Sequence, residues 1–147
     1  MTFYAVIDTN IVVSSMLKHD SNPGLIIDFV TTGTIIPLLN DEIINEYFTV
    51  LSRNKFGFDD TSIKETIDVI KKNAIYLKRG QTLETFIDKD DIVFFEIVLS
   101  VRSTMDAYLV TGNIKHYPIR SYIVTPKEMI DIIEKENGPF KGMPDNL

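Results

Sequence analysis

The sequence contains no cysteine, and its only histidines are His19 and His116. The lack of cysteine excludes disulfides and thiolate metal sites, and the scarcity of histidine argues against an imidazole-rich zinc site. A metal ion bound by this chain would therefore be held mainly by oxygen atoms. That ligand chemistry favours Mg²⁺ or Mn²⁺.

The sequence pattern predicts neither a secretory signal nor a membrane-spanning helix. No basic residue precedes the N-terminal apolar run, and Asp8 interrupts it. The uncharged stretch between Asp28 and Asp41 is much shorter than the roughly 20 apolar residues that a spanning helix requires. We therefore expect a cytoplasmic protein with no membrane partner.

Length and charge limit the classes of protein that remain. A chain of 147 residues is long enough for one domain with a substantial core and too short for two. Its net charge of −6 argues against a strongly basic nucleic-acid-binding protein. A nuclease is compatible with this charge, because an acidic metal site contributes several negative charges itself.

Predicted strands and helices alternate along the chain. Runs of β-branched and aromatic residues predict strands at 3–7, 34–39, 74–77, 107–110 and 122–124. Apolar spacing and capping residues predict helices at 10–17, 23–30, 41–51, from about 60 through at least 70, from 91 to 101, and at 126–136. This α/β alternation predicts a mainly parallel sheet with helices on both faces. We expect one domain at 1–137 and a mobile C-terminal tail at 138–147, which contains two prolines and two glycines.

Acidic and amide residues occur where parallel sheets bind ligands, beyond the carboxyl ends of the strands. Asp8 ends the first strand, Asp91 begins a helix, and Asn113 follows the fourth strand. Glu46 borders the apolar face of the helix at 41–51, where it can point back toward the strand ends. Clustered carboxylates raise one another's pKa, and a bound divalent cation reverses that cost. Their joint placement therefore predicts a metal site.

Each of these residues also has a purely structural interpretation. Asp8 can cap the following helix, Glu46 can be an exposed helix residue, and the acidic run at 88–91 can complement a helix dipole. Asn113 follows Gly112 and can simply shape a turn in a left-handed conformation. Taken singly, none of these residues identifies a site.

Five segments carry motifs in an order that resembles a known family. They are VIDTNIVVS at 6–14, Glu42 to Leu51 followed by RNKFG at 53–57, DKDD at 88–91 before FFEI, LVTGNIKHYP at 109–118, and VTPKE at 124–128. Together they resemble the PIN domain, a ribonuclease fold best known from VapC-like toxins of bacterial toxin–antitoxin modules. The resemblance covers nearly the whole chain. It implies a three-layer α/β/α fold and Mg²⁺- or Mn²⁺-dependent endonuclease activity on RNA.

The resemblance also implies roles for individual residues. It assigns metal binding and catalysis to Asp8, Glu46 and Asp91, with Asp88 as an additional ligand or as a neighbour that supports the ligands. Asn10 would order the first carboxylate through its amide. Asn113 stands where many family members have aspartate, so we include it in the catalytic set. Its amide oxygen can bind a metal or a metal's water but adds no negative charge, which lowers the expected affinity for a second metal.

The expected partners are an RNA substrate, a cognate antitoxin protein and a second copy of this chain. Asn10, Lys115 and His116 are candidates for contact with the RNA, although His116 can equally be an ordinary surface residue. A homodimer is expected from family behaviour and from apolar faces beyond the needs of one core. The sequence does not indicate the RNA target.

Two other functions remain open. A phosphatase of the haloacid-dehalogenase type would fit a strand ending in Asp8, but its chemistry uses a second carboxylate two residues later, where this chain has Asn10. A PIN-like module that binds RNA or protein without cleavage is favoured by Asn113 and the acidic net charge.

Overall fold

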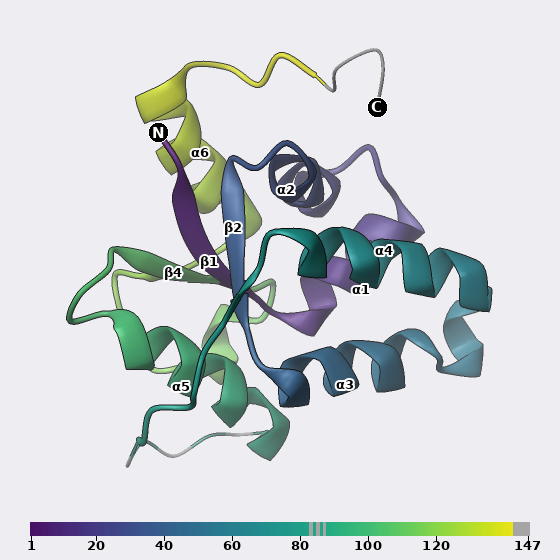
Figure 1. Cartoon of the computed structure of the whole chain (residues 1–147), viewed down its shortest axis with the longest axis horizontal. Coiled ribbons are helices and arrows are strands. Elements are labelled where there is room, and N and C mark those ends of the chain that lie inside the picture. The colour runs from purple at the N-terminus through teal and green to yellow at the C-terminus, as the bar shows by residue number, and fades with distance from the viewer. Residues whose placement is uncertain (83, 85, 87, 143–147) are drawn as a thin grey trace.

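A computed structural model describes residues 1–82, 84, 86 and 88–142. In these residues five parallel strands form one central sheet (Figure 1). The strands are β1 (Phe3–Ile7), β2 (Ile35–Leu39), β3 (Ile75–Tyr76), β4 (Ala107–Val110) and β5 (Ile123–Val124), and their order across the sheet is β3-β2-β1-β4-β5. The predicted α/β fold with helices packed around a parallel sheet is confirmed.

Six α-helices connect and cover the strands in the described part of the chain. They are α1 (Thr9–Leu17), α2 (Asn22–Thr31), α3 (Asp41–Leu51), α4 (Asp60–Lys72), α5 (Ile92–Val101) and α6 (Pro126–Asn137). Side-chain caps set several of their starts: Asn40 accepts the Ile43 N–H, and Thr125 forms a capping box with Glu128. The predicted bounds agree with these elements to within one residue at the ends that were specified.

Three short 3₁₀ helices in the described residues were not predicted. They are Asn54–Phe56, Lys89–Asp91 and Ile114–His116, and they occupy segments expected to be loops or turns. A helix of three residues is too short to produce a periodic apolar pattern, so the sequence carries no signal for it. The first follows α3, the second precedes α5 and the third follows β4, and each of the three contributes residues to the pocket described below.

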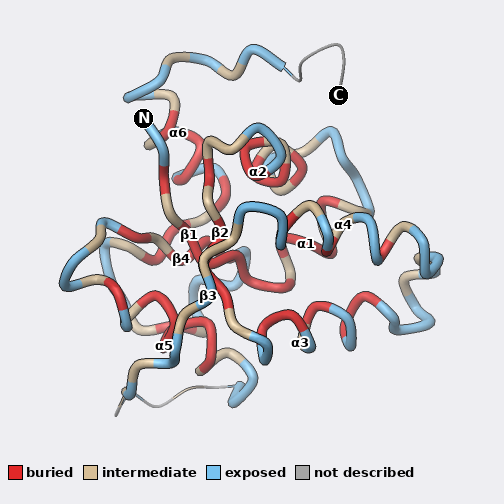
Figure 2. Tube along the Cα trace, viewed as in Figure 1, coloured by how far each residue is buried: buried red, intermediate tan, exposed pale blue. Residues whose placement is uncertain are grey.

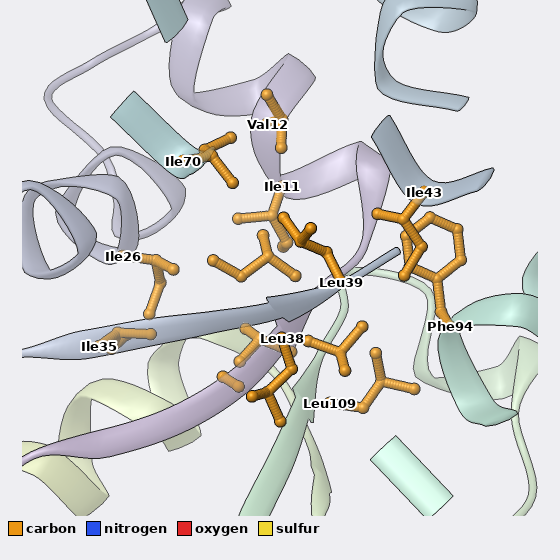
Figure 3. Packing of buried hydrophobic residues seen from close by; sticks show 14 of the residues in the cluster. Ile11, Val12, Ile26, Ile35, Leu38, Leu39, Ile43, Ile70, Phe94 and Leu109 are labelled. Carbon is orange, nitrogen blue, oxygen red and sulfur yellow. The ribbon is translucent and has the colours of Figure 1, made fainter. Parts of the chain in front are cut away.

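The hydrophobic core lies between the sheet and the helices that pack on it (Figure 2). Leu39 of β2 lies on the same side of the sheet as Ile11 of α1 and Ile26 of α2, whereas Leu38 of β2 and Leu109 of β4 lie on the other side (Figure 3). The predicted apolar face of α3 is buried at Ile44, Tyr47 and Leu51, but Phe48 remains 40% exposed. Phe48 lies on the edge of that face, over a hollow between α3 and α4.

The order of the strands places the ligand-binding edge of the sheet between β1 and β4. The chain runs from β1 to β2 on one side, whereas β4 pairs with β1 on the other. Ile7 is in register with Val110, and the Asp8 N–H donates to the Val110 carbonyl at 3.0 Å. Ligands of open parallel sheets bind where the strand order reverses in this way. Asp8 and the residues after β4 therefore lie side by side at that point.

Two further expectations concern the membrane and the C-terminus. In the described ranges, none of the helices has the length and apolar character needed to span a bilayer. Residues 143–147 of the expected tail lie outside the described residues. Within 138–142, the ring of Phe140 packs edge-on against Phe29 of α2, with 5.2 Å between centroids. This contact attaches the first part of the tail to the domain.

Candidate active site

An open pocket of about 360 Å³ lies beyond the carboxyl ends of β1 and β4. Five carboxylates line it, contributed by Asp8, Glu46, Asp88, Asp90 and Asp91. The structure therefore brings together all four carboxylates predicted from the sequence and adds Asp90. Asn10, Asn113 and His116 also line this pocket, whereas Lys115 lines a neighbouring apolar hollow.

Asp8 is buried at the base of the pocket and is held by three side-chain donors. Its Oδ2 accepts hydrogen bonds from Thr111 Oγ1 at 2.7 Å, from Tyr117 OH at 3.0 Å and from Asn10 Nδ2 at 3.3 Å. Burial raises the pKa of Asp8, and the hydrogen bonds from Thr111 and Tyr117 only partly oppose that rise. Although Asp8 occupies the N-cap position of α1, its side chain accepts no capping hydrogen bond. Its contacts are those of a positioned carboxylate rather than a helix cap.

The loop after β4 is tied to the start of α1. Thr111 Oγ1, which donates to Asp8, accepts the Asn113 N–H at 3.0 Å. Asn10 Oδ1 accepts the Gly112 N–H at 3.0 Å, so its amide bridges this loop and Asp8. The interpretation that Asn113 adopts a left-handed conformation is wrong, because its φ is −115°. The hydrogen bond to Thr111 holds this backbone without a left-handed turn.

Glu46 reaches the pocket from α3. The neighbouring Tyr47 is buried and donates its hydroxyl hydrogen bond to the carbonyl of Ile7, which anchors α3 to the end of β1. Partial burial raises the pKa of Glu46, and Asp90 adds to the rise by repulsion while Arg53 opposes it. The interpretation of Glu46 as a fully exposed helix residue is therefore wrong: it is partly buried and within electrostatic reach of the other acids.

The fold also opposes the ionisation of Asp91. Burial, followed by repulsion from Asp8 and Asp88, raises the pKa of Asp91 from 3.8 to about 6. His116 opposes the rise, since its Nδ1 lies 3.2 Å from Asp91 Oδ2. Asp88 also has a local structural role, because its side chain accepts the Asp90 N–H at 2.9 Å and caps the short helix Lys89–Asp91.

The donor atoms of this pocket fit a divalent cation held largely through water. They are carboxylate, amide and hydroxyl oxygens, with one imidazole. The hydroxyl of Thr9 is buried and has no hydrogen-bond partner among the described residues. No three histidine or acidic side chains in the described ranges converge closely enough to bind one ion directly. Mg²⁺ commonly keeps several waters and contacts few carboxylates, so this spacing suits it.

Residues around Asp8 and Asp91 that escaped prediction from the sequence include Thr9, Asp90, Thr111 and Tyr117. Thr111 directly follows β4, so the rule that ligands lie beyond strand ends could have identified it. Tyr117 lies six residues further along an irregular loop, and no spacing rule connects it with Asp8. Only the folded loop brings its hydroxyl to that carboxylate.

The raised pKa of Asp91 predicts how the stability of the metal-free protein depends on pH. Between its ordinary pKa of 3.8 and about 6, the folded chain binds more protons at Asp91 than the unfolded chain does. Stability should therefore fall as pH rises through this window, by at most about 3 kcal/mol for a shift of this size. Thermal unfolding in a metal chelator should give a higher melting temperature near about pH 5 than near about pH 7. Asp91→Asn should flatten this dependence, and an unchanged slope in that variant would contradict the assignment to Asp91.

Comparison with known proteins identifies the family. Residues 4–115, well over half of the chain, match the PIN domain, so this protein belongs to the PIN-domain family. The chain is 23% identical over 145 residues to an uncharacterized protein of Methanocaldococcus jannaschii, in an alignment covering 88% of this chain and 91% of that protein. No solved structure matches the chain. PIN domains are generally nucleases that use divalent metals, which gives this chain a nuclease-type function.

Proposed function

We propose that this protein is a metal-dependent endoribonuclease that acts as the toxin of a toxin–antitoxin module. The observation that supports the metal-dependent activity best is the pocket beyond the carboxyl ends of β1 and β4, which is lined by Asp8, Glu46 and Asp91, all three with raised pKa values. Uncompensated carboxylates at one point destabilise a fold, and a divalent cation removes that cost. The RNA substrate and the toxin role rest on the likeness to VapC-like PIN ribonucleases.

In this proposal Asp8, Glu46 and Asp91 hold one Mg²⁺ or Mn²⁺, largely through water, and Asp88 supports them. When bound, the ion supplies positive charge beside the scissile phosphate and makes a water molecule more acidic. Thr111, Tyr117 and Asn10 keep the Asp8 carboxylate fixed, which limits the reorganisation needed during the reaction.

Asp91 is suited to accept a proton from the attacking water. Its carboxylate lines the pocket that would hold this water, and in the metal-free protein burial and repulsion from Asp8 and Asp88 raise its pKa to about 6. His116 Nδ1 orients the Asp91 carboxylate at 3.2 Å and lies on the wall of the same pocket. Asp88, whose Oδ1 is engaged with the Asp90 N–H, has less freedom for this role.

Incubation of end-labelled single-stranded RNA with the protein tests the proposed activity. Internal cleavage in Mn²⁺ that stops on addition of a chelator is the expected result. Intact RNA at every metal concentration would leave the second candidate, a PIN-like module that binds RNA or protein without cleavage. That alternative is favoured by Asn113, whose neutral amide lines the pocket where many relatives carry a carboxylate. A phosphatase is disfavoured because both amide atoms of Asn10 are engaged in hydrogen bonds.

The toxin role carries two further proposals, a homodimer and a cognate antitoxin. Ile119 is 97% exposed beside a hollow of about 620 Å³ that Ile114 and Pro118 also line. An apolar surface of this kind is compatible with a protein partner. A short neighbouring gene for a DNA-binding protein would support the antitoxin, and light scattering at micromolar concentration would show whether the chain is a dimer.

Asn113 determines how much negative charge faces a metal in this pocket. We expect Asn113→Asp to strengthen Mn²⁺ binding and to preserve or raise RNA cleavage, because it adds a carboxylate where the amide now lines the wall. The φ of −115° is open to aspartate, so the substitution should not strain the backbone. Calorimetric titration of Mn²⁺ into both proteins measures the difference, and equal affinities would remove Asn113 from the metal site.

A further inference from the structure

A short segment at the rim of the pocket combines two cations with two aromatic rings. This rim segment, residues 53–58, begins after α3 and contains the 3₁₀ helix Asn54–Phe56. Arg53, Lys55 and Phe56 line the same pocket as the five carboxylates. Among the described residues, Arg53 and Lys55 are the only lysine or arginine side chains that line this pocket.

In the described residues, Arg53 and Lys55 form no ion pair with an acidic side chain, unlike the other arginines. The other three arginines, Arg79, Arg102 and Arg120, each form an ion pair with an acidic side chain. Within the described ranges neither Arg53 nor Lys55 has such a partner, and both are exposed. In a chain of net charge −6, two unpaired cations beside five carboxylates are positioned to attract a phosphate that those carboxylates would repel.

The aromatic rings of the rim segment form a fixed apolar surface beside these cations. Phe56 and Phe58 stack with 5.6 Å between their centroids and an angle of 15° between their planes. Gly57 has a φ of 68°, a left-handed conformation that lets the chain turn between the two rings. Both rings are half-buried against the core, and Lys55 Nζ lies 5.1 Å from the centroid of Phe56. A ring braced in this way offers a stacking surface at little entropic cost.

We propose that the rim segment binds a single strand of RNA and guides it into the acidic pocket. Arg53 and Lys55 contact its phosphates, and the ring of Phe56 packs against a base. Single strands expose base faces that aromatic side chains can stack on, whereas a duplex hides them and is recognised through a wide array of backbone contacts. Two cations at one rim of an acidic protein do not provide that array. This inference rests on the proposed ribonuclease function and assigns the binding of its substrate to named residues of the rim segment.

The inference is tested by measuring how tightly the protein binds a fluorescent single-stranded RNA of about 12 nucleotides. Binding is measured by fluorescence anisotropy, with Ca²⁺ in place of Mn²⁺. A gel at the end of the measurement verifies that the RNA is intact. The double variant Arg53→Gln/Lys55→Gln should weaken binding at least about 10-fold and reduce its dependence on salt. Phe56→Leu keeps apolar volume but removes the ring, and should weaken binding by about 10-fold with the salt dependence unchanged.

Matched controls separate the rim segment from general effects of charge and aromatic content. Lys72→Gln removes an exposed lysine at the end of α4, and Phe48→Leu removes an exposed ring on α3; both should bind RNA like the parent protein. The rise in melting temperature caused by Mn²⁺ should persist in all variants, because none removes a pocket carboxylate. Parental RNA affinity in the rim variants, or equal affinity for a duplex of the same sequence, would overturn this inference alone. Absence of both the Mn²⁺ effect and cleavage in the parent protein would instead overturn the proposed function.

Discussion

Asp8→Asn should lower the rate of RNA cleavage by roughly 100- to 1000-fold, the usual cost of removing one group that stabilises charge at a reacting centre. Asparagine keeps the shape of the side chain and can still accept hydrogen bonds from Thr111 and Tyr117. It loses the negative charge that would attract the cation. Single-turnover cleavage in saturating Mn²⁺ measures the effect directly.

The fold of this variant should survive, and its metal-free form should melt at a higher temperature than the parent. Burial raises the pKa of Asp8, so neutralising this side chain removes an unfavourable charge from the interior. Tyr117→Phe removes one donor to Asp8 and should lower cleavage by about 10-fold to 100-fold. Tyr76→Phe, which changes a half-exposed tyrosine on β3, serves as its control. Parental cleavage by Asp8→Asn would exclude Asp8 from the chemistry.

Glu96→Ala should destabilise the protein by about 2–4 kcal/mol, because it removes one partner of a largely buried ion pair. Glu96 lies in α5 and is 8% exposed. Its Oε1 accepts hydrogen bonds from Arg79 Nε at 2.8 Å and from the Nη2 of the same guanidinium, and its Oε2 accepts the Thr82 N–H at 3.1 Å. The variant leaves Arg79 paired only with the exposed Glu42.

Urea unfolding of Glu96→Ala compared with Glu65→Ala measures this contribution. Glu65 is exposed on α4, so its replacement should change the free energy of unfolding by no more than about 0.5 kcal/mol. Because Asp91 is the N-cap residue of α5, loosening this helix should also weaken Mn²⁺ binding. Equal unfolding free energies for the two variants would show that the contacts of Glu96 do not stabilise the fold.

The sequence predicted the sheet and most helices because each carries a local signal. The apolar β-branched run Phe3–Ile7 ends at a charged residue, and Asn40 and Thr125 mark helix starts by their capping chemistry. The pocket carboxylates followed from the same reasoning, because parallel strands bring their carboxyl ends to one edge. Asp8 and Glu46 could thus be placed near each other before any contact was known.

Contacts that depend on irregular segments could not be predicted in this way. Glu96 lies within the strongly apolar run Ile92–Val101, and its partner Arg79 precedes it by 17 positions, across a segment without periodicity. The hydrogen bond from Tyr117 to Asp8 likewise depends on the path of the loop after β4. Lys115 shows the converse: it is adjacent to His116 in sequence, yet the 3₁₀ turn directs it to a different hollow.

The melting temperature of the metal-free protein, measured at increasing concentrations of Mn²⁺, tests whether the five carboxylates form a metal site. A ligand that binds only the folded chain at 100 times its Kd adds about 2.7 kcal/mol of stability. The melting temperature should therefore rise and saturate in the parent protein and in Glu65→Gln, which changes an exposed acid on α4 that does not line the pocket. The rise should be much smaller in Asp8→Asn. No rise in the parent protein, or an equal rise in Asp8→Asn, would contradict the assignment of this pocket as a metal-dependent nuclease site.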